Sequence, residues 1–290
     1  MPKNVLDKAI SYIKQNKVIR DVLVSGGDPL TLNNDRLDYI LSELRSIPHV
    51  EVIRIGTRVL VTNPYRIDNE LCNIIKKYHP VWVMTQFNHP KELTKAAIRA
   101  CDQLTDSGVP LSNQTVLLRG VNDCPSLQKE LVQNLVQNRI RPYYLYQCDL
   151  SEGIEHFRTP VAKGIEIIEH LRGHTSGYAV PNYVIDAPGG GGKVPINPSY
   201  TLSQSPGEFI IRNHEGRIVS YPDPDCGETH DSQSCQYCKQ ARSSQQGVAS
   251  LFQKDKFGLQ LKDIVRKIDS KKMNRDRIFS NGCVKKDCSS

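Results

Sequence analysis

Residues 21–27 read DVLVSGG, a short run of apolar and β-branched residues that ends in two glycines. Similar runs begin at residues 51, 81, 113, 142 and 182, at a spacing of about thirty residues for the first five, the length of one strand–helix unit. The segments between them carry apolar residues at helical spacing, as in the set Leu37, Ile40, Leu41 and Leu44. Strands that alternate with helices predict a parallel sheet. Five such units and a further strand at 182–186 favour a barrel or partial barrel over a short open sheet.

Polar residues gather mainly where the predicted strands end. The segment 25–28 (SGGD) follows the first strand, Gln86 the third and Asp149 the fifth, while Asp186 ends the last and Gln114 lies near the start of the fourth. Turn chemistry or helix capping explains any one aspartate. The whole set predicts a shared mouth, the place where barrel enzymes build active sites. Two carboxylates there would suit a cationic group of a substrate.

The segment 186–196 reads DAPGGGGKVPI and presents Lys193 after four glycines. It is not a phosphate-binding P-loop, because Ala187 and Val194 occupy positions that must be Gly and Ser or Thr. One interpretation is a solvent-exposed lysine on a glycine turn. The other is an amine inside a barrel mouth, where it would react with an aldehyde such as pyridoxal phosphate. Glycine backbone there could also approach a phosphate closely.

Cysteines suggest a metal site. Cys226, Cys235 and Cys238 have the spacing C-x8-C-x2-C, and two thiolates two residues apart can hold one tetrahedral zinc. A structural zinc needs a fourth ligand, for which His230 or a distant cysteine such as Cys124 is a candidate. By contrast, Cys72 and Cys101 lie on apolar faces of predicted helices and are expected in the core.

The composition is that of an ordinary soluble protein. The chain has 290 residues, of which 38% are hydrophobic and 24% charged, with a formal net charge of +7. No run of 18 apolar residues predicts a membrane span, and the first residues lack an apolar signal core, so a cytoplasmic location is expected. Basic residues concentrate only after residue 253 with few aromatics, which favours a solvated tail over a nucleic-acid site. We expect a barrel over 1–196, a β appendage with a zinc knuckle over 197–245, and a basic tail over 246–290.

The longest motifs carry a family resemblance. DVLVSGGDPL, KKYHPVWVMTQFNHP, RPYYLYQCDLSEGIEHFRTPV and VIDAPGGGGK lie within about residues 3–222, and over that range the chain resembles lysine 2,3-aminomutase, a radical-SAM enzyme that also uses pyridoxal phosphate. The resemblance implies a partial (β/α) barrel of the radical-SAM type that lacks its first unit.

The resemblance also implies roles for individual residues. Lys193 corresponds to the lysine that forms a Schiff base with pyridoxal phosphate, while Asp149 and Asp186 match the pair that holds the side-chain ammonium of L-lysine. Residues implied to bind S-adenosylmethionine are Gly26, Gly27, Asp28 and Gln114. The implied zinc ligands are Cys226, Cys235, Cys238 and, from a neighbouring subunit, Cys124, which predicts a homo-oligomer.

The implied reaction is the radical 2,3-amino shift that converts L-lysine to L-β-lysine. Such enzymes hold a [4Fe–4S] cluster with C-x3-C-x2-C, and that spacing is absent from these 290 residues. We therefore expect this chain alone to be inactive. It could be a fragment, one piece of a split enzyme, or a decayed copy that binds zinc and pyridoxal phosphate without catalysis; the intact substrate and cofactor positions favour a fragment. A mutase for another basic amino acid, such as arginine, is a further alternative.

Overall fold

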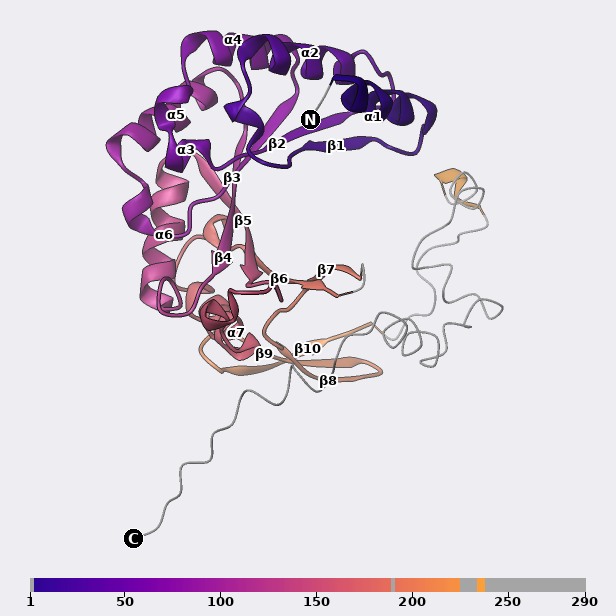
Figure 1. The fold of residues 1–290 in the computed structure, drawn as a ribbon. Coiled ribbons are helices and arrows are strands. Elements are labelled where there is room, and N and C mark those ends of the chain that lie inside the picture. The colour runs from indigo at the N-terminus through magenta and orange to yellow at the C-terminus, as the bar shows by residue number, and fades with distance from the viewer. Residues whose placement is uncertain (1–2, 189–190, 225–233, 238–290) are drawn as a thin grey trace. The chain divides into compact units, whose positions relative to one another are not determined.

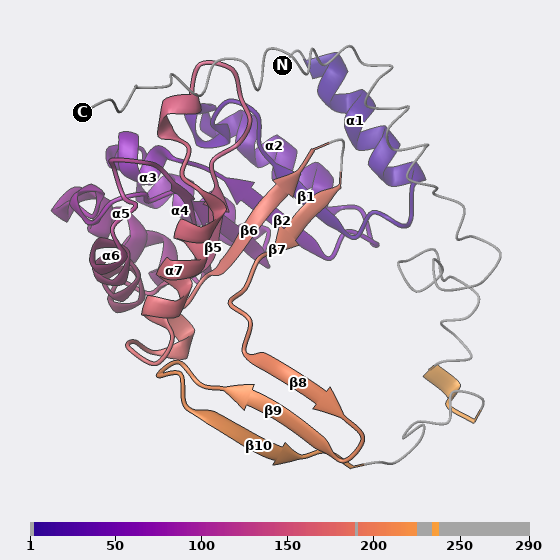
Figure 2. The same cartoon turned by 90° about the horizontal axis from the view of Figure 1, so that it is seen from below.

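The computed structural model describes residues 3–188, 191–224 and 234–237, drawn as coloured ribbon in Figures 1 and 2. The helices are α1 (Lys3–Gln15), α2 (Asn34–Arg45), α3 (Val59–Thr62), α4 (Asn69–Lys77), α5 (Lys95–Asp106), α6 (Pro125–Gln137) and α7 (Val161–Leu171). Short 3-10 helices are η1 (Pro29–Thr31), η2 (Pro64–Arg66), η3 (Pro90–Glu92), η4 (Glu155–Phe157) and η5 (Gly177–Ala179). The strands of the larger sheet are β1 (Asp21–Val24), β2 (Val52–Gly56), β3 (Val81–Thr85), β4 (Leu111–Leu117), β5 (Ile140–Gln147), β6 (Asn182–Ala187) and β7 (Gly192–Pro195).

These strands form one sheet in the order of the sequence, from β1 to β7. Strands β1 to β6 are parallel, and β7 runs antiparallel to β6. The sheet curls, and the helices between the strands cover its outer side (Figure 1). The predicted partial α/β barrel is therefore confirmed.

The curled sheet has one buried face and one open face, because successive side chains of a strand point in opposite directions. In β2, Ile53 and Ile55 are fully buried under the helices, whereas Arg54 between them is half-exposed. In β4, the residues that alternate with the buried ones include Gln114. Gln114 therefore lies on the inner face of the sheet, opposite the helical layer.

Side-chain caps explain where several helices start. The side chains of Asn33, Asp68 and Thr94 accept hydrogen bonds from backbone N–H groups in the first turns of α2, α4 and α5. Each cap satisfies a donor that the helix itself leaves free. The predicted core positions on α2 are confirmed, since Leu37, Ile40, Leu41 and Leu44 are all buried.

A second core cluster lies under α7 and is centred on Tyr183 of β6, which is fully buried. Gly164 of α7 lies flat against its ring, so that an added Cβ would be 2.2 Å from a ring carbon. The Tyr183 hydroxyl donates to the Gln147 side chain at 2.7 Å. Tyr183, near the start of β6, thus joins the end of β5 to α7.

The structure differs from the sequence pattern at three strands. β4 and β5 each begin two residues before the predicted runs. The segment after the glycines is a strand rather than a loop, and Lys193 pairs with Asp186 across β6 and β7. The sequence pattern does not predict this strand, because glycines have no side chains that could alternate between apolar and polar.

Residues 201–222 form a second sheet of three strands, β8 (Thr201–Ser205), β9 (Glu208–Arg212) and β10 (Ile218–Pro222). Neighbouring strands run in opposite directions, in the spatial order β10-β9-β8 (Figure 2). They occur where the sequence alternates between apolar and polar residues. The limits expected for the domains stay predictions. None of the helices in the described part of the chain has the length and apolar character that crossing a membrane requires.

Candidate active site at the carboxyl edge of the sheet

The parallel arrangement brings the ends of β1 to β6 to one edge of the sheet. The polar residues that follow the strands in sequence therefore collect along this edge, as predicted for a barrel mouth. Gln114 is an exception, because it lies within β4, paired in register with Tyr144 of β5.

Two glycines shape the turn after β1. Gly26 has φ of +90° and Gly27 of +50°, a region that L-residues rarely adopt. No heavy atom lies within 4 Å of a Cβ added at either glycine. Both glycines are exposed, and together with Asp28 they line a cavity of about 670 Å³ whose other walls come from α1, β1, η1 and α2.

Asp28, the next residue, turns its carboxylate towards β2. Its Oδ1 accepts hydrogen bonds from the Leu30 N–H at 3.1 Å and from the Thr57 hydroxyl at 2.6 Å. Its Oδ2 accepts from the Arg58 N–H at 2.6 Å. Asp28 therefore fastens the turn after β1 to the end of β2.

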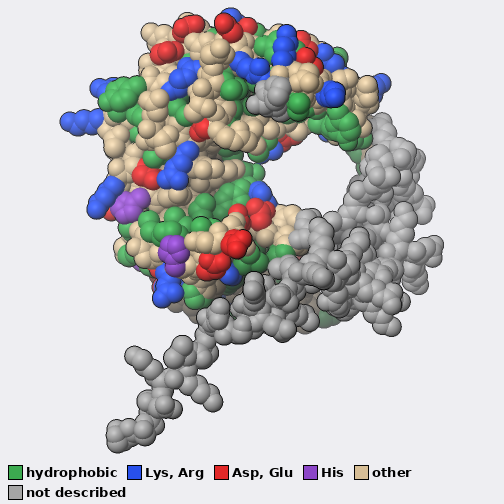
Figure 3. Space-filling model, viewed as in Figure 1, with side chains coloured by type: hydrophobic (Ala, Val, Ile, Leu, Met, Phe, Trp, Pro, Cys, Tyr) green, Lys and Arg blue, Asp and Glu red, His purple; other side chains and the backbone are tan. Residues whose placement is uncertain are grey.

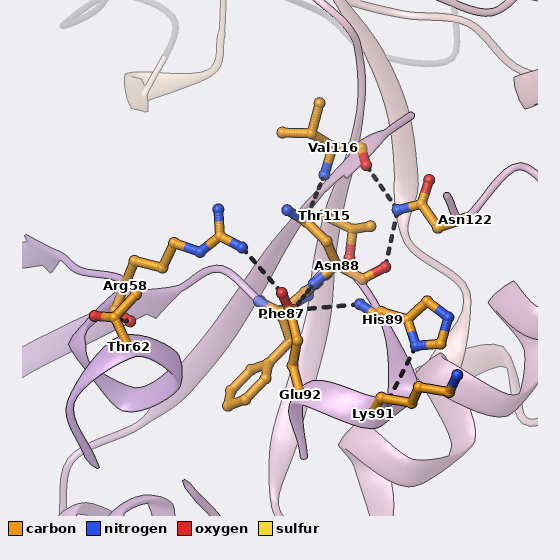
Figure 4. A network of polar contacts seen from close by, with 11 residues as sticks. Arg58, Thr62, Phe87, Asn88, His89, Lys91, Glu92, Thr115, Val116 and Asn122 are labelled. Carbon is orange, nitrogen blue, oxygen red and sulfur yellow. Dashed lines mark hydrogen bonds and ion pairs between the residues drawn. The ribbon is translucent and has the colours of Figure 1, made fainter. Parts of the chain in front are cut away.

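Arg58 continues this link to β3 (Figure 4). Its guanidinium donates to Glu92 Oε1 at 2.9 Å, and Glu92 Oε2 accepts from the backbone N–H of Asn88 at 2.5 Å and of His89 at 3.3 Å. The Glu92 side chain is only 22% exposed, so the ion pair is partly shielded from water. Glu92 thereby caps the end of β3 and holds it beside the end of β2.

Two asparagines complete the link to β4. The Asn88 side chain accepts from the Val116 N–H at 2.8 Å. Asn122 is fully buried; it donates to the Asn88 and Val116 carbonyls, both at 2.8 Å, and accepts from the Leu118 N–H at 2.7 Å. We call the set Asp28, Thr57, Arg58, Glu92, Asn88 and Asn122 the edge network. Sequence reasoning missed it except for Asp28, although the polar segment FNHPKE (87–92) directly after a strand was a usable signal.

The other end of the sheet holds the predicted lysine. Lys193 Nζ lies 3.0 and 3.1 Å from the two carboxylate oxygens of Asp186 and 5.2 Å from the ring centroid of Tyr146. Burial raises the pKa of the Tyr146 phenol, and the charge of Asp186 raises it further, so Tyr146 stays protonated and neutral. The Lys193 side chain is 43% exposed, which leaves the amine open to a ligand.

Aromatic residues of β5 lie beside this pair on the inner face. The Tyr144 ring is 3.9 Å from the Tyr143 ring and 5.4 Å from the Tyr146 ring, measured between centroids. Asp149, the second predicted carboxylate, follows β5 and is exposed. Next to it, Cys148 is buried, and burial followed by the charge of Asp149 raises the pKa of its thiol.

The predicted zinc ligands are only partly described. Cys124 is exposed at the start of α6, and Cys235 is half-buried. Cys226, Cys238 and His230 lie outside the described residues. No group of three metal-binding side chains occurs among the residues that the structure does describe. The core prediction for Cys72 and Cys101 is confirmed, and burial raises the pKa of Cys101 to about 12.

Fold and site thus define a partial α/β barrel with an uncovered glycine turn at one end of its polar edge and a lysine–aspartate pair at the other. A family model described as lysine-2,3-aminomutase matches residues 168–287. L-lysine 2,3-aminomutase of Fusobacterium nucleatum is 60% identical over 231 residues, which cover 80% of this chain and 54% of the relative. The L-lysine 2,3-aminomutase of Acetoanaerobium sticklandii is 55% identical over 263 residues, which cover 90% of this chain and 63% of the relative.

Two other proteins are more distantly similar to this chain. Glutamate 2,3-aminomutase of Clostridioides difficile is 49% identical over 221 residues, covering 76% of this chain and 52% of the relative. The crystal structure of Streptococcus suis SuiB has a TM-score of 0.47 at 12% identity, over 63% of this chain and 43% of that chain, a likeness too low to support a conclusion. The resemblance to lysine 2,3-aminomutases is confirmed by the sequence relatives, of which the chain spans about half the length.

The edge network predicts a large loss of stability on removal of Asn122. Asn122→Ala leaves one buried carbonyl, one part-buried carbonyl and one part-buried N–H without this partner, and unpaired buried groups cost about 1–3 kcal/mol each. We expect the free energy of unfolding to fall by at least about 3 kcal/mol, measured by urea denaturation. Asn73→Ala, at an exposed position of α4, is the control and should change it by less than about 0.5 kcal/mol. Equal stability of the two variants would show that the network is not needed.

Proposed function

We propose that this chain carries the substrate and pyridoxal phosphate sites of an L-lysine 2,3-aminomutase, an isomerase that moves the amino group of L-lysine from C2 to C3. The observation that supports this most directly is the Lys193–Asp186 pair beside Tyr146 at the edge of the sheet. A reactive amine, a carboxylate for a cation and an aromatic wall are what such a site requires.

Lys193 would hold pyridoxal phosphate covalently through its amine. The residues fit this cofactor, because the amine is accessible and lies at the open edge of the sheet. Pyridoxal phosphate, when bound, supplies a conjugated system that can carry a migrating amino group. The neutral phenol of Tyr146 lines the same place and would form one wall beside the cofactor.

Asp186 and Asp149 would bind the side-chain ammonium of the substrate. Asp186 is paired with the Lys193 ammonium in the structure. If the Lys193 amine were bonded to a cofactor, it would no longer be an ammonium group paired with Asp186, and the carboxylate could accept hydrogen bonds from a cationic substrate. A basic amino acid is thus favoured, and L-lysine is the substrate that the names of the sequence relatives give to those proteins.

The turn after β1 would bind S-adenosylmethionine, with Gln114 on the inner face as a further contact. The uncovered backbone of Gly26 and Gly27 fits this role, because amide and carbonyl groups can there reach a ligand directly. A [4Fe–4S] cluster does not fit the residues present, since the 290 residues contain no C-x3-C-x2-C. We expect the ligands of a cluster to come from another polypeptide segment.

We also propose that zinc joins subunits through Cys124 of one copy and Cys226, Cys235 and Cys238 of another. The exposure of Cys124 supports this role, because a ligand shared between copies must lie on the surface. Four thiolates form a closed, structural site.

The pyridoxal proposal predicts that Lys193→Ala loses covalent cofactor binding. The protein is incubated with pyridoxal phosphate and reduced with borohydride, and the modified peptide is located by mass spectrometry. We expect the label on the peptide that contains Lys193 and its loss in Lys193→Ala. Lys76→Ala, which removes an exposed lysine of α4, should keep the label. Labelling that is unchanged in Lys193→Ala would refute the assignment.

The zinc proposal predicts that Cys124→Ser weakens both metal binding and assembly. Removal of one of four thiolates should lower the zinc content per chain and shift the protein to a smaller species, measured by elemental analysis and by light scattering. Cys283→Ser is the control because it removes a cysteine outside the proposed ligand set. An oligomer of unchanged size and zinc content in Cys124→Ser would contradict a shared site.

The reaction itself is tested by formation of β-lysine. After anaerobic incubation with iron, sulfide, S-adenosylmethionine and pyridoxal phosphate, we expect no β-lysine from the 290-residue chain. We expect turnover when the remaining segment of the Fusobacterium nucleatum relative is supplied as a separate polypeptide. Turnover by the chain alone would refute the need for external cluster ligands. Failure of the supplemented chain, despite cofactor binding, would refute the proposed activity.

A further inference from the structure

The Asp28 carboxylate points towards the residues that follow β2. Asp28 follows the two glycines whose backbone is uncovered, so a ligand held by that turn would lie close to it. Yet its carboxylate already accepts three hydrogen bonds from the protein: from the N–H groups of Leu30 and Arg58 and from the Thr57 hydroxyl. The two shortest, both 2.6 Å, reach the residues that follow β2.

The turn after β1 has no strand pairing of its own, so side-chain hydrogen bonds must hold it. β1 lies at the edge of the described sheet, and its register with β2 ends at Val24 and Ile55. Beyond that point no strand pairing holds residues 25–28 in place. Glycine at two successive positions adds backbone freedom, which a ligand would otherwise have to restrict on binding.

Thr57 is placed to hold the Asp28 carboxylate. It is 2% exposed, its hydroxyl donates to Asp28, and its oxygen accepts from the Val59 N–H at 3.0 Å. Because Thr57 is buried, a ligand at the turn does not reach its hydroxyl, which acts on the turn through the hydrogen bond to Asp28. Arg58 extends the same connection to Glu92 and hence to β3.

We propose that Asp28 is a positioning residue and not a ligand-contacting residue. Its carboxylate, held by Thr57 and the Arg58 N–H, fixes the Gly26–Gly27 backbone in the form that binds the amino-acid end of S-adenosylmethionine. That end is a zwitterion, which backbone N–H and C=O groups can recognise from both charges. This inference rests on the proposed function, since it assumes the same ligand at the turn.

The experiment compares Asp28→Asn, Thr57→Val and Thr57→Ser in the full chain. Thr57→Val keeps the shape of the side chain but removes the hydroxyl, whereas Thr57→Ser keeps the hydroxyl. S-adenosylmethionine binding is measured by calorimetry, and amide hydrogen exchange is followed at Leu30 and Arg58. Covalent loading of pyridoxal phosphate on Lys193 is measured in each variant as a readout of the rest of the fold.

We expect Asp28→Asn and Thr57→Val both to weaken S-adenosylmethionine binding, by about tenfold, because apparent affinity falls with the population of the ordered turn. Exchange at Leu30 and Arg58 should become faster in both variants. Thr57→Ser should restore binding and protection, and loading of Lys193 should stay unchanged in all three. A general loss of structure would lower that loading as well.

Three outcomes overturn the inference. If Thr57→Val binds S-adenosylmethionine as tightly as the unaltered chain while Asp28→Asn does not, Asp28 contacts the ligand directly. Unchanged amide exchange in both variants would show that the turn does not depend on the carboxylate. If the unaltered chain binds pyridoxal phosphate but no S-adenosylmethionine, the proposed ligand of the turn is wrong, and the role of Asp28 fails with it.

Discussion

The backbone at the carboxyl ends of the parallel strands is the constraint on which the rest of the structure depends. Where a strand leaves the sheet, its N–H and C=O groups lose their ladder partners, and buried groups of this kind must be paired. The structure solves this with side chains rather than with further secondary structure. The fully buried Asn122 alone pairs three backbone groups: the Asn88 carbonyl after β3, the Val116 carbonyl near the end of β4 and the Leu118 N–H just beyond it.

The loop after each of these strands is held in place by residues of the next loop. The turn after β1 is held by residues after β2, and those are held by Glu92 after β3. The binding groups at the edge therefore owe their positions to contacts between successive units. Buried polar networks stabilise a fold when their members are paired, and each member of the edge network has a hydrogen-bond partner within it.

The opposite end of the edge is organised differently. Lys193 and Asp186 lie on adjacent antiparallel strands and are about 40% exposed, so their ion pair adds little to stability. Both groups remain open to ligands, as the proposed site requires. Because the pair adds little to stability, it could separate at low cost if Lys193 held a cofactor as proposed.

The sequence by itself determined the alternation of strands and helices, the parallel order, the core faces of helices such as α2, and the glycine turn and lysine as candidate binding groups. These follow from local patterns, because apolar spacing and turn residues act over a few positions. Only the tertiary structure decided that Asp28 faces β2 and that Lys193, on a seventh strand, pairs with Asp186 on the sixth. It also decided that Asn88, Glu92 and Asn122 join the ends of neighbouring strands. Each of these contacts joins residues whose side-chain directions depend on how separate strands are placed, and no local pattern carries that information.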